Sequence, residues 1–388
     1  MPPPERLQEA VAARLPRFLA ELETLVSIDC GSYTPDGVNR VADAVAASLA
    51  ELGATVERHH HEPADDEPQL GDLVVGRLAG EGPRLLLIGH MDTVFDPGTA
   101  AQRPYRVDGD RATGPGTSDM KGGLLAGLHA LAALRATGAR PNVTFVANPD
   151  EEIGSTFSGP HIRRLAAHHD AALALECARA NGDIVSARKG IADLAITFHG
   201  RAAHAGVEPE KGRSAILAAA RQVIRLHELN GRWPSVTVNA GVIAGGTRTN
   251  VVAERCVVQL DLRAATTAEF EAASQEVERI LGQAAVADVT AEVRRLAHHP
   301  PMERTPANAR LAELAIAIAG ELGFELHDTA TGGAGDANIT SHAGLPSLDG
   351  LGPIGGDDHS ADEWLDVSSI VPRTTLLAAL ISRVGEAL

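Results

Sequence analysis

Histidine and carboxylate side chains follow several short apolar segments of this chain. The segment RLLLIGHMD (84–92) ends with His90 and Asp92. Because these residues are two apart in an extended segment, their side chains point to one face. A histidine that binds a metal is commonly held through its second ring nitrogen by a carboxylate, which Asp92 would supply. A polar turn at the end of a strand explains the pair equally well, so the pair alone leaves both interpretations open.

A second candidate, Asp119, lies among glycines in TGPGTSDMKGG (113–123). An aspartate before a helix is often only a cap. A phosphate-binding loop is excluded, because the G-x-x-x-x-G-K-[ST] pattern is missing and the aspartate would repel phosphate. Glycines let the backbone bend into a crowded site. We therefore favour a carboxylate that bridges metal ions.

Three carboxylates, Asp150, Glu151 and Glu152, follow the apolar start of VTFVANPDEEIG (143–154). A solvated acidic turn is the plain alternative. Their place directly after a buried strand is the carboxyl edge at which open α/β sheets position their sites. One glutamate could bind a metal while its neighbour takes a proton from the activated water.

Glu176 and His359 complete a set of five candidate metal ligands. Glu176 ends AALALE (171–176), and His359 lies in GGDDHS (355–360). Taken alone, Glu176 could be a charge at the end of a strand, and His359 could be an exposed loop histidine. Mixed histidine and carboxylate ligands suit zinc, with cobalt or manganese as substitutes, and five ligands exceed the three of a mononuclear catalytic zinc site. Two zinc ions about 3.5–4 Å apart would share one carboxylate and jointly activate a water. The division would be His90, Asp119 and Glu176 on one ion, and Asp119, Glu152 and His359 on the other.

The segments that carry these residues alternate between strand and helix patterns. Segments 72–78, 84–89 and 142–148 are short and rich in Val, Leu and Ile, as buried strands are. Segment 121–137 is rich in Leu and Ala and predicts a buried helix. This alternation predicts an α/β layer with a mainly parallel sheet.

A different order of elements begins near residue 190. It is the β-α-β-β-α-β order of a ferredoxin-like domain. A helix at 307–322 then follows Pro300 and Pro301. The sequence therefore predicts a catalytic domain in two parts, 1–189 and 298–388, and an inserted domain at 190–297. The elements expected in the inserted domain are strand 192–199, helix 213–229, strands 235–243 and 251–263, helix 266–283 and strand 288–295.

Composition excludes several classes of protein. The 388 residues include 34 Lys and Arg against 51 Asp and Glu, a formal charge of −17, which argues against binding nucleic acid or anionic membranes. No membrane span is expected, because no run of 18 apolar residues occurs. The charged N-terminal segment lacks the apolar centre of an export signal. Three widely spaced cysteines suggest reduced thiols in a cytoplasmic protein.

The apolar residues of the N-terminal segment recur at helical spacing, which predicts one helix face. The residues of that face are Leu7, Val11, Leu15 and Leu19.

Five motifs occur in a fixed order: HMDTVFDPGTA (90–100), GPGTSDMKGG (114–123), NPDEEIGS (148–155), GRAAHAG (200–206) and the DHS around His359. Together they resemble the di-zinc exopeptidase family of aminoacylase, acetylornithine deacetylase, succinyl-diaminopimelate desuccinylase and glutamate carboxypeptidase. HMDTV and DEEIGS are most similar to the carboxypeptidase G type. The resemblance extends over nearly the whole chain. It implies a zinc-exopeptidase-like α/β catalytic domain with an inserted ferredoxin-like α+β domain that acts as lid and dimerisation domain.

The resemblance assigns a role to each candidate of the catalytic domain. Asp119 matches the bridging ligand, and Asp92 matches the residue that clamps a zinc-bound histidine. Glu151 matches the general base, which takes a proton from the attacking water and returns it to the leaving amine. The other matched ligands are His90, Glu152, Glu176 and His359.

Further matches concern the substrate. His204 matches a lid histidine that, in dimeric members, reaches the neighbouring subunit's site and helps to hold the developing oxyanion. Asn250 in RTN and Arg263 in DLR match lid residues that contact the substrate carboxylate. Gly355 and Gly356 lie in the loop that receives the same end of the substrate. A solvated loop histidine and a solvated strand charge are the alternatives for His204 and Arg263.

The resemblance implies a zinc-dependent hydrolase that cleaves an amide bond next to a free carboxylate, in a small peptide or an N-acyl amino acid. We favour a glutamate-carboxypeptidase-like enzyme that releases a C-terminal amino acid; an N-acyl-amino-acid deacylase is the alternative. Arg179, Arg188 and Lys189 are candidates for binding a glutamate side chain. A non-catalytic binding protein would lack the complete set around Glu151, and a serine hydrolase would need the missing G-x-S-x-G.

Overall fold

The computed structural model describes residues 3–65 and 67–388, and the chain forms two compact units. The first unit consists of the described residues of Met1–Ser186 together with Arg304–Ala330 and Gly335–Leu388. The second consists of Ala187–Glu303 and the short stretch Thr331–Ala334. The chain crosses from one unit to the other four times: within β8 (Ile184–Arg188), after Glu303, within β13 (Asp328–Thr331) and after Ala334.

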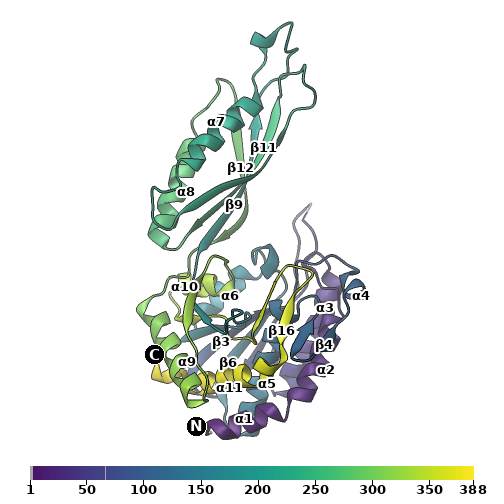
Figure 1. Ribbon diagram of the computed structural model, residues 1–388, viewed down its shortest axis with the longest axis vertical. Coiled ribbons are helices and arrows are strands. Elements are labelled where there is room, and N and C mark those ends of the chain that lie inside the picture. The colour runs from purple at the N-terminus through teal and green to yellow at the C-terminus, as the bar shows by residue number, and fades with distance from the viewer. Residues whose placement is uncertain (1–2, 66) are drawn as a thin grey trace. The chain divides into compact units, whose positions relative to one another are not determined.

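A six-stranded sheet forms the centre of the first unit, in the order β1-β2-β6-β3-β7-β14. Its strands β3 and β6 are labelled in Figure 1. Neighbours from β6 to β14 run parallel, whereas β2 is antiparallel to both β1 and β6. The prediction of a mixed α/β fold with a mainly parallel sheet is therefore confirmed, with an antiparallel edge. The strands are β1 (Thr55–His59), β2 (Leu73–Leu78), β3 (Glu81–His90), β6 (Pro141–Asn148), β7 (Ala171–Ala174) and β14 (Ser347–Leu348).

Helices cover both faces of this sheet because successive strand residues point to opposite sides. Leu85 and Leu87 of β3 belong to the large core cluster, while Leu86 and Ile88 belong to a second, smaller cluster. The large cluster contains residues of α1 (Pro4–Ala12), α2 (Leu15–Val26), α3 (Pro35–Glu51), α5 (Gly122–Ala136), α9 (Pro306–Glu321) and α11 (Val367–Arg383). The smaller cluster contains residues of α6 (Gly159–Ala166) and α10 (Asp336–His342).

Two N-terminal helices stand where the sequence predicts a single helix face. The break at Ala13 and Arg14 separates α1 from α2, and Pro16 lies in the first turn of α2. A proline in that position cannot continue a preceding helix, because it lacks the N–H and clashes with the preceding turn. The break resets the helical phase, so Leu15 and Leu19 are only partly buried. The expectation of a single helix was therefore wrong, although Leu15 and Leu19 still pack against the large core cluster that contains Leu7.

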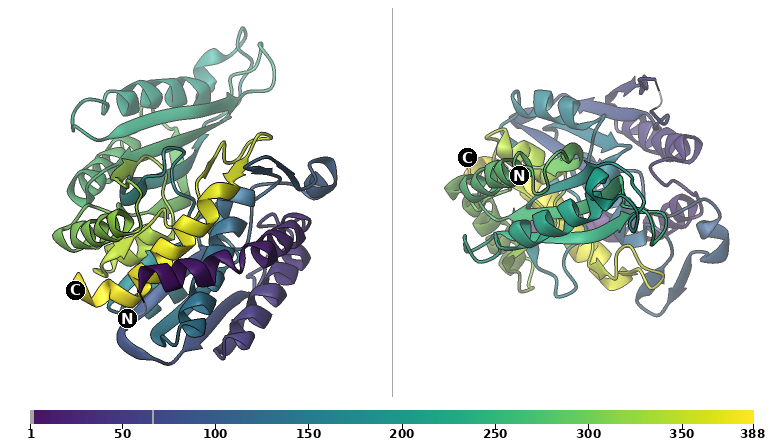
Figure 2. Two further views of the ribbon diagram at one scale, coloured as in Figure 1. Left: turned by 60° about the horizontal axis from the view of Figure 1, so that its bottom comes forward. Right: turned by 90° about the horizontal axis from the view of Figure 1, so that it is seen from above.

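The C-terminal helix is a core element of the first unit. Within the described residues, Val367–Glu386 is the stretch long and apolar enough to cross a membrane, and 67% of its most apolar window is buried. Helix α11 packs against α5, α9 and α1, and α1 lies beside it in Figure 2 (left). Helix α5 is buried along most of its length and stands where a buried helix is predicted at 121–137.

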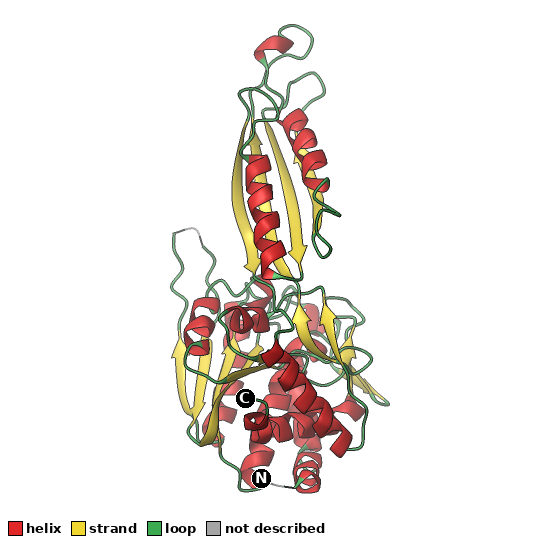
Figure 3. Ribbon diagram, turned by 90° about the vertical axis from the view of Figure 1, so that its left-hand side faces the viewer, coloured by secondary structure: helices red, strands yellow, loops and turns green. Residues whose placement is uncertain are grey.

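The second unit contains a four-stranded antiparallel sheet with two helices on one face (Figure 3). Its strand order is β10-β11-β9-β12, and both helices contribute to a core with Phe198 and Leu260. In chain order the elements are β9 (Gly190–His199), α7 (Ala215–His227), β10 (Thr237–Gly245), β11 (Arg255–Ala264), α8 (Thr267–Leu281) and β12 (Thr290–His299).

A smaller antiparallel sheet in the first unit has the order β15-β16-β5-β4. Its strands are β4 (Arg106–Asp108), β5 (Arg111–Thr113), β15 (Gly355–Gly356) and β16 (Trp364–Asp366). The remaining elements are short: α4 (Thr99–Gln102) and the turns η1 (Thr117–Lys121), η2 (Glu151–Ile153), η3 (Pro209–Lys211) and η4 (Val384–Glu386).

Candidate metal centre

Three neighbouring parallel strands bring candidate ligands to one edge of the central sheet. His90 is the last residue of β3, and Glu176 follows β7 by two residues. Glu151 and Glu152 form the turn η2 just beyond β6. Because β6, β3 and β7 are adjacent and parallel, their carboxyl ends meet at the same edge, where α/β sheets place their sites.

Asp119 lies between two histidines, one facing each carboxylate oxygen. Its Oδ1 is 3.0 Å from Nε2 of His90, and its Oδ2 is 3.1 Å from Nε2 of His359. Nε2 of His359 is also 3.1 Å from Oε2 of Glu152, and Nε2 of His90 is 3.5 Å from Oε1 of Glu176. The structure thus brings all five predicted ligands together in the first unit, around Asp119.

Asp92 holds the same site from behind and is almost fully buried. Nδ1 of His90 is 3.0 Å from the Asp92 backbone oxygen and 3.4 Å from its carboxylate. The Asp92 carboxylate accepts the backbone N–H groups of Glu151 at 3.1 Å and Glu152 at 3.2 Å, and the hydroxyl of Ser32 at 2.6 Å. One carboxylate therefore positions both the histidine and the two glutamates.

Burial and mutual repulsion shift the pKa values of these groups. Burial raises the pKa of Glu151 well above its usual range, and the charges of Glu176 and Glu152 add to the rise. Burial likewise raises the pKa of Glu152. Hydrogen bonds to Asp119 and Glu152 raise the pKa of His359 to about 11. The cluster therefore concentrates more negative charge than its two histidines balance.

The donor set fits divalent zinc. His90, Asp119 and Glu152 have ligand atoms within 4.8 Å of one another, and so do His90, Glu151 and Glu176. Oε1 of Glu152 is buried without a hydrogen-bond partner among the described residues. Buried carboxylates are normally paired or coordinated to a metal, and imidazole with carboxylate is a common zinc ligand set.

Two further carboxylates, Asp336 and Asp150, hold the turn of Glu151 and Glu152 through contacts that the sequence did not indicate. Asp336 is buried, and its carboxylate accepts hydrogen bonds from the Ser155 hydroxyl at 2.6 Å and from the side-chain amide of Asn148. Burial raises the pKa of Asp336 to about 7. Asp150 points away from the centre and accepts the N–H of Phe157 at 2.6 Å. These contacts fix both ends of η2, but their partners are distant in sequence or ordinary polar residues, so spacing could not identify them.

Gly355 and Gly356 lie in β15, and Gly355 has a packing reason of its own. A Cβ at Gly355 would lie 2.1 Å from Oγ of Ser118 and 2.7 Å from the backbone oxygen of Trp364. A Cβ at Gly356 would lie 3.3 Å from the Trp364 ring. Glycine lets β15 approach both η1 and β16 closely.

The predicted substrate residues of the second unit fall into two groups. The segments of His204 and Asn250 are adjacent, since the Ala205 N–H donates to the Asn250 backbone oxygen at 3.0 Å. Arg263 contacts the carboxylate of Asp261 at 2.9 Å and donates to the backbone oxygen of Gly332 at 2.7 Å. His204 and Asn250 lie near the end of β11 that begins at Arg255, which pairs with His199 of β9. Arg263 lies near the opposite end of the same strand. At about 3.3 Å per residue, the two ends of the strand are about 26 Å apart.

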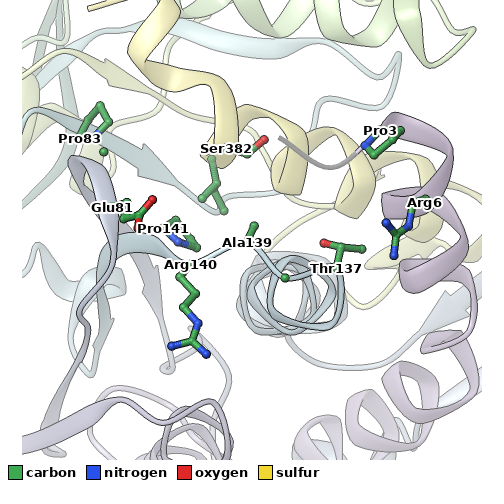
Figure 4. A pocket seen from close by; sticks show the side chains of 12 residues that line it. Pro3, Arg6, Glu81, Pro83, Thr137, Ala139, Arg140, Pro141 and Ser382 are labelled. Carbon is green, nitrogen blue, oxygen red and sulfur yellow. The ribbon is translucent and has the colours of Figure 1, made fainter.

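A pocket elsewhere on the first unit is separate from this centre. Its lining includes Glu81 and Pro83 near the start of β3 and Pro141 at the start of β6 (Figure 4). His90 ends the same strand β3. The pocket therefore lies at the amino edge of the sheet, opposite the candidate ligands, and contains none of the predicted site residues.

The fold and the ligand cluster define a metal-dependent hydrolase, and comparisons with known proteins identify its family. The sequence model of the family described as "Peptidase family M20/M25/M40" matches residues 86–383 of this chain. The chain is 32% identical over 385 residues to carboxypeptidase G2 of Pseudomonas sp. (strain RS-16), covering 98% of this chain and 92% of that protein. It is 30% identical over 380 residues to succinyl-diaminopimelate desuccinylase of Leptothrix cholodnii, covering 90% and 96%. The chain therefore belongs to peptidase family M20/M25/M40.

Solved structures agree with this assignment at the level of the fold. Aminopeptidase PepT from Bacillus cereus superposes with a TM-score of 0.73 at 23% identity, covering 95% of this chain and 98% of that one. An M20 family metallo-carboxypeptidase from Sulfolobus solfataricus gives 0.72 at 15% identity, covering 94% and 98%. The predicted family and the prediction of a zinc-dependent hydrolase acting on C–N bonds are thus confirmed.

Proposed function

We propose that this chain is a dinuclear zinc carboxypeptidase that hydrolyses an amide bond next to a free carboxylate and releases a C-terminal amino acid. The observation that carries the proposal is the position of Asp119, whose two carboxylate oxygens face His90 and His359 separately. A carboxylate in this position suits a bridge between two ions. The similarity to carboxypeptidase G2 along nearly the whole chain supports the type of reaction.

The residues on each side of Asp119 would hold one ion each, with cobalt or manganese as possible substitutes. When bound, the ions polarise the scissile carbonyl and make a nucleophilic water available at neutral pH. The chain itself must hold both sets of ligand side chains in place. The sets are His90, Asp119 and Glu176 on one side, and Asp119, Glu152 and His359 on the other.

Glu151 is the proposed general base. Its backbone N–H is held by Asp92 at 3.1 Å, and its side chain is partly buried beside Glu176 and His90. Burial raises its pKa, which makes the carboxylate a stronger proton acceptor near neutral pH. Glu151 accepts a proton from the attacking water and passes it to the leaving nitrogen.

His204, Asn250 and Arg263 are proposed to contact the substrate, His204 by donating to the developing oxyanion and Arg263 by binding the carboxylate in a bidentate manner. The separation of about 26 Å along β11 argues against one protomer supplying all three to one small substrate. We therefore propose a homodimer in which the second unit is the lid and dimerisation domain, and His204 and Asn250 serve the neighbouring protomer. The apolar side chains Ile216, Leu217 and Ile224 of α7 and Val242 and Ile243 of β10 are exposed on the second unit, as an interface requires.

An N-acyl-amino-acid deacylase of the acetylornithine or succinyl-diaminopimelate kind is the second candidate. It is favoured by the 30% identity to succinyl-diaminopimelate desuccinylase over 380 residues. Both activities use the same centre and differ in the groups on either side of the amide. Small peptides and N-acyl amino acids are thus the proposed substrates.

The proposal is tested by metal analysis combined with a substrate panel on chelated and zinc-reconstituted protein. We expect two zinc ions per chain and activity on glutamyl amides of the folate type that exceeds activity on N-acetyl and N-succinyl amino acids. Higher turnover of the N-acyl substrates would favour the deacylase. Full activity after exhaustive chelation would exclude both. Reduced, buried Cys30, Cys177 and Cys256 accord with the predicted cytoplasmic location, which stays a prediction.

A further inference from the structure

Glu363 is a buried carboxylate that binds the backbone of the Asp119 loop. Its Oε1 accepts the N–H groups of Ser118 at 2.8 Å and Asp119 at 3.1 Å, and its Oε2 accepts the N–H of Gly116 at 2.8 Å. The residue is 1% exposed. Three backbone donors converge on one carboxyl group, and together they fix the direction of the loop as well as its position.

The Asp119 loop needs such support because its backbone is irregular. The turn η1 departs from helical geometry at Asp119, where φ is −112° and ψ is 95°. Gly116 before it adopts a left-handed conformation with φ of 74°, and a Cβ there would lie 2.7 Å from Cγ2 of Thr93. A regular helix would fix its N–H groups through its own ladder. Here the donors of residues 116, 118 and 119 are bound by one side chain from a distant segment.

Strand pairing places Glu363 opposite this loop. Trp364 of β16 pairs with Thr113 of β5, and Leu365 pairs with Ala112. Glu363 comes just before the paired residues of β16, and the loop that starts at Gly114 comes just after those of β5. Because the two strands are antiparallel, Glu363 and this loop lie at the same end of the pair. His359 lies in the same segment as Glu363, four residues earlier. The segment that contributes His359 thus also binds the Asp119 loop through Glu363.

We propose that Glu363 is a positioning residue that orients the Asp119 carboxylate so that its two oxygens can bind two metal ions at once. This inference rests on the proposed dinuclear function. A bridging carboxylate must be held to within about 0.5 Å and 10–20° to serve both ions. Residues that act through a ligand in this way change metal affinity when they are altered, typically by roughly 10- to 100-fold. A purely structural role would change only the stability of the fold.

Zinc titration of chelated protein separates these two roles. In Glu363→Gln an amide NH2 replaces one oxygen and faces an N–H donor, so at least one of the three bonds is lost. We expect this variant to fold, to bind the more weakly held zinc ion roughly 10- to 100-fold less tightly in competition with a chromogenic chelator, and to show an altered Co²⁺ absorption spectrum. Faster hydrogen exchange at residues 114–121 of the metal-free protein should accompany these changes. The matched control is Asp362→Asn, an exposed carboxylate one residue away, which should behave as the wild type.

Glu363→Asp is the second variant, since it keeps both oxygens but shortens their reach, and its zinc affinity should lie between those of wild type and Glu363→Gln. Zinc affinities and Co²⁺ spectra equal to wild type in the variants that fold, even with a lower Tm, would overturn the positioning role. Failure of the proposed function looks different, because the wild-type chain itself would then bind fewer than two zinc ions.

Discussion

The Asp92 carboxylate accepts the backbone N–H of Glu151 at 3.1 Å, so the residue that contacts His90, a candidate metal ligand, also fixes the proposed base. Asp92 Oδ2 binds the neighbouring Glu152 N–H at 3.2 Å in the same way. A single buried side chain therefore connects the end of β3 with the turn after β6. The two strands are adjacent and parallel, which makes this connection short.

Substitution of Asp92 should accordingly affect catalysis and metal binding together. In Asp92→Asn, an amide NH2 replaces one carboxylate oxygen and faces a backbone N–H that this oxygen accepts in the wild type. The turn at Glu151 and Glu152 would therefore shift. We expect kcat to fall roughly 10- to 100-fold and zinc affinity to weaken. Steady-state kinetics and zinc titration measure the two effects. Asp96→Asn, at a nearby exposed carboxylate, is the control and should leave both values unchanged.

Glu151→Gln should separate metal binding from turnover. The substitution removes the proton acceptor and preserves the size of the side chain. We expect two zinc ions to remain bound while kcat falls by roughly 10²- to 10⁴-fold, the usual contribution of a general base. Metal analysis and initial rates test this directly, with the exposed Glu62→Gln as control. Near-normal activity would show that the base is misassigned. Loss of zinc would show that Glu151 is a ligand.

Arg263→Ala should weaken the binding of substrates that carry a free carboxylate. Losing a hydrogen-bonded charge typically costs about 1.5–3 kcal/mol, so KM should rise roughly 10- to 100-fold with a smaller change in kcat. Arg255→Ala, at the exposed opposite end of the same strand, is the matched control. The proposed role fails if substrates with a free carboxylate and their carboxamide analogues respond equally to Arg263→Ala.

Removal of the metal ions should destabilise the fold and not only abolish activity. Chelation leaves the buried carboxylates of Asp119 and Glu152 without a cation, and the stabilisation from ligand binding is lost. For zinc at about 1,000 times its Kd this loss is about 4 kcal/mol, which corresponds to a fall in Tm of several degrees. Calorimetry with and without added zinc measures it. Asp119→Asn should show a much smaller response to zinc, and an identical response would contradict the assignment of the bridge.

Acid should weaken a contact network distant from the centre. Arg14 donates to Nδ1 of His129, whose Nε2 is 2.8 Å from Glu21. Burial alone would raise the pKa of Glu21, but hydrogen bonds from His129 and Arg17 lower it from 4.5 to about 2. A carboxyl group whose pKa is lower in the folded state adds stability above its unfolded pKa and loses it as the pH falls towards the folded value.

We therefore expect Glu21→Gln to lower Tm by about one to two degrees at pH 7, the effect of about 1 kcal/mol after solvent screening. The difference from wild type should shrink between pH 4.5 and pH 3. Thermal unfolding across this range provides the measurement, and Glu23→Gln, at an exposed glutamate, is the control. A difference that stays constant with pH would show that the ionised form of Glu21 contributes nothing.

The sequence alone indicated the candidate ligands and the strands that carry them. Apolar periodicity is local, and so is the rule that places a polar residue at the carboxyl end of a buried strand, which is why His90, Glu152 and Glu176 could be predicted from short segments. Tertiary structure decided what local patterns do not encode. The pairing of β16 with β5 brings Glu363 to the Asp119 loop across some 245 residues. The break before Pro16 divides the expected helix into two, and the length of β11 separates Arg263 from His204. Each of these depends on register or on contacts between distant segments, and a one-dimensional pattern contains neither.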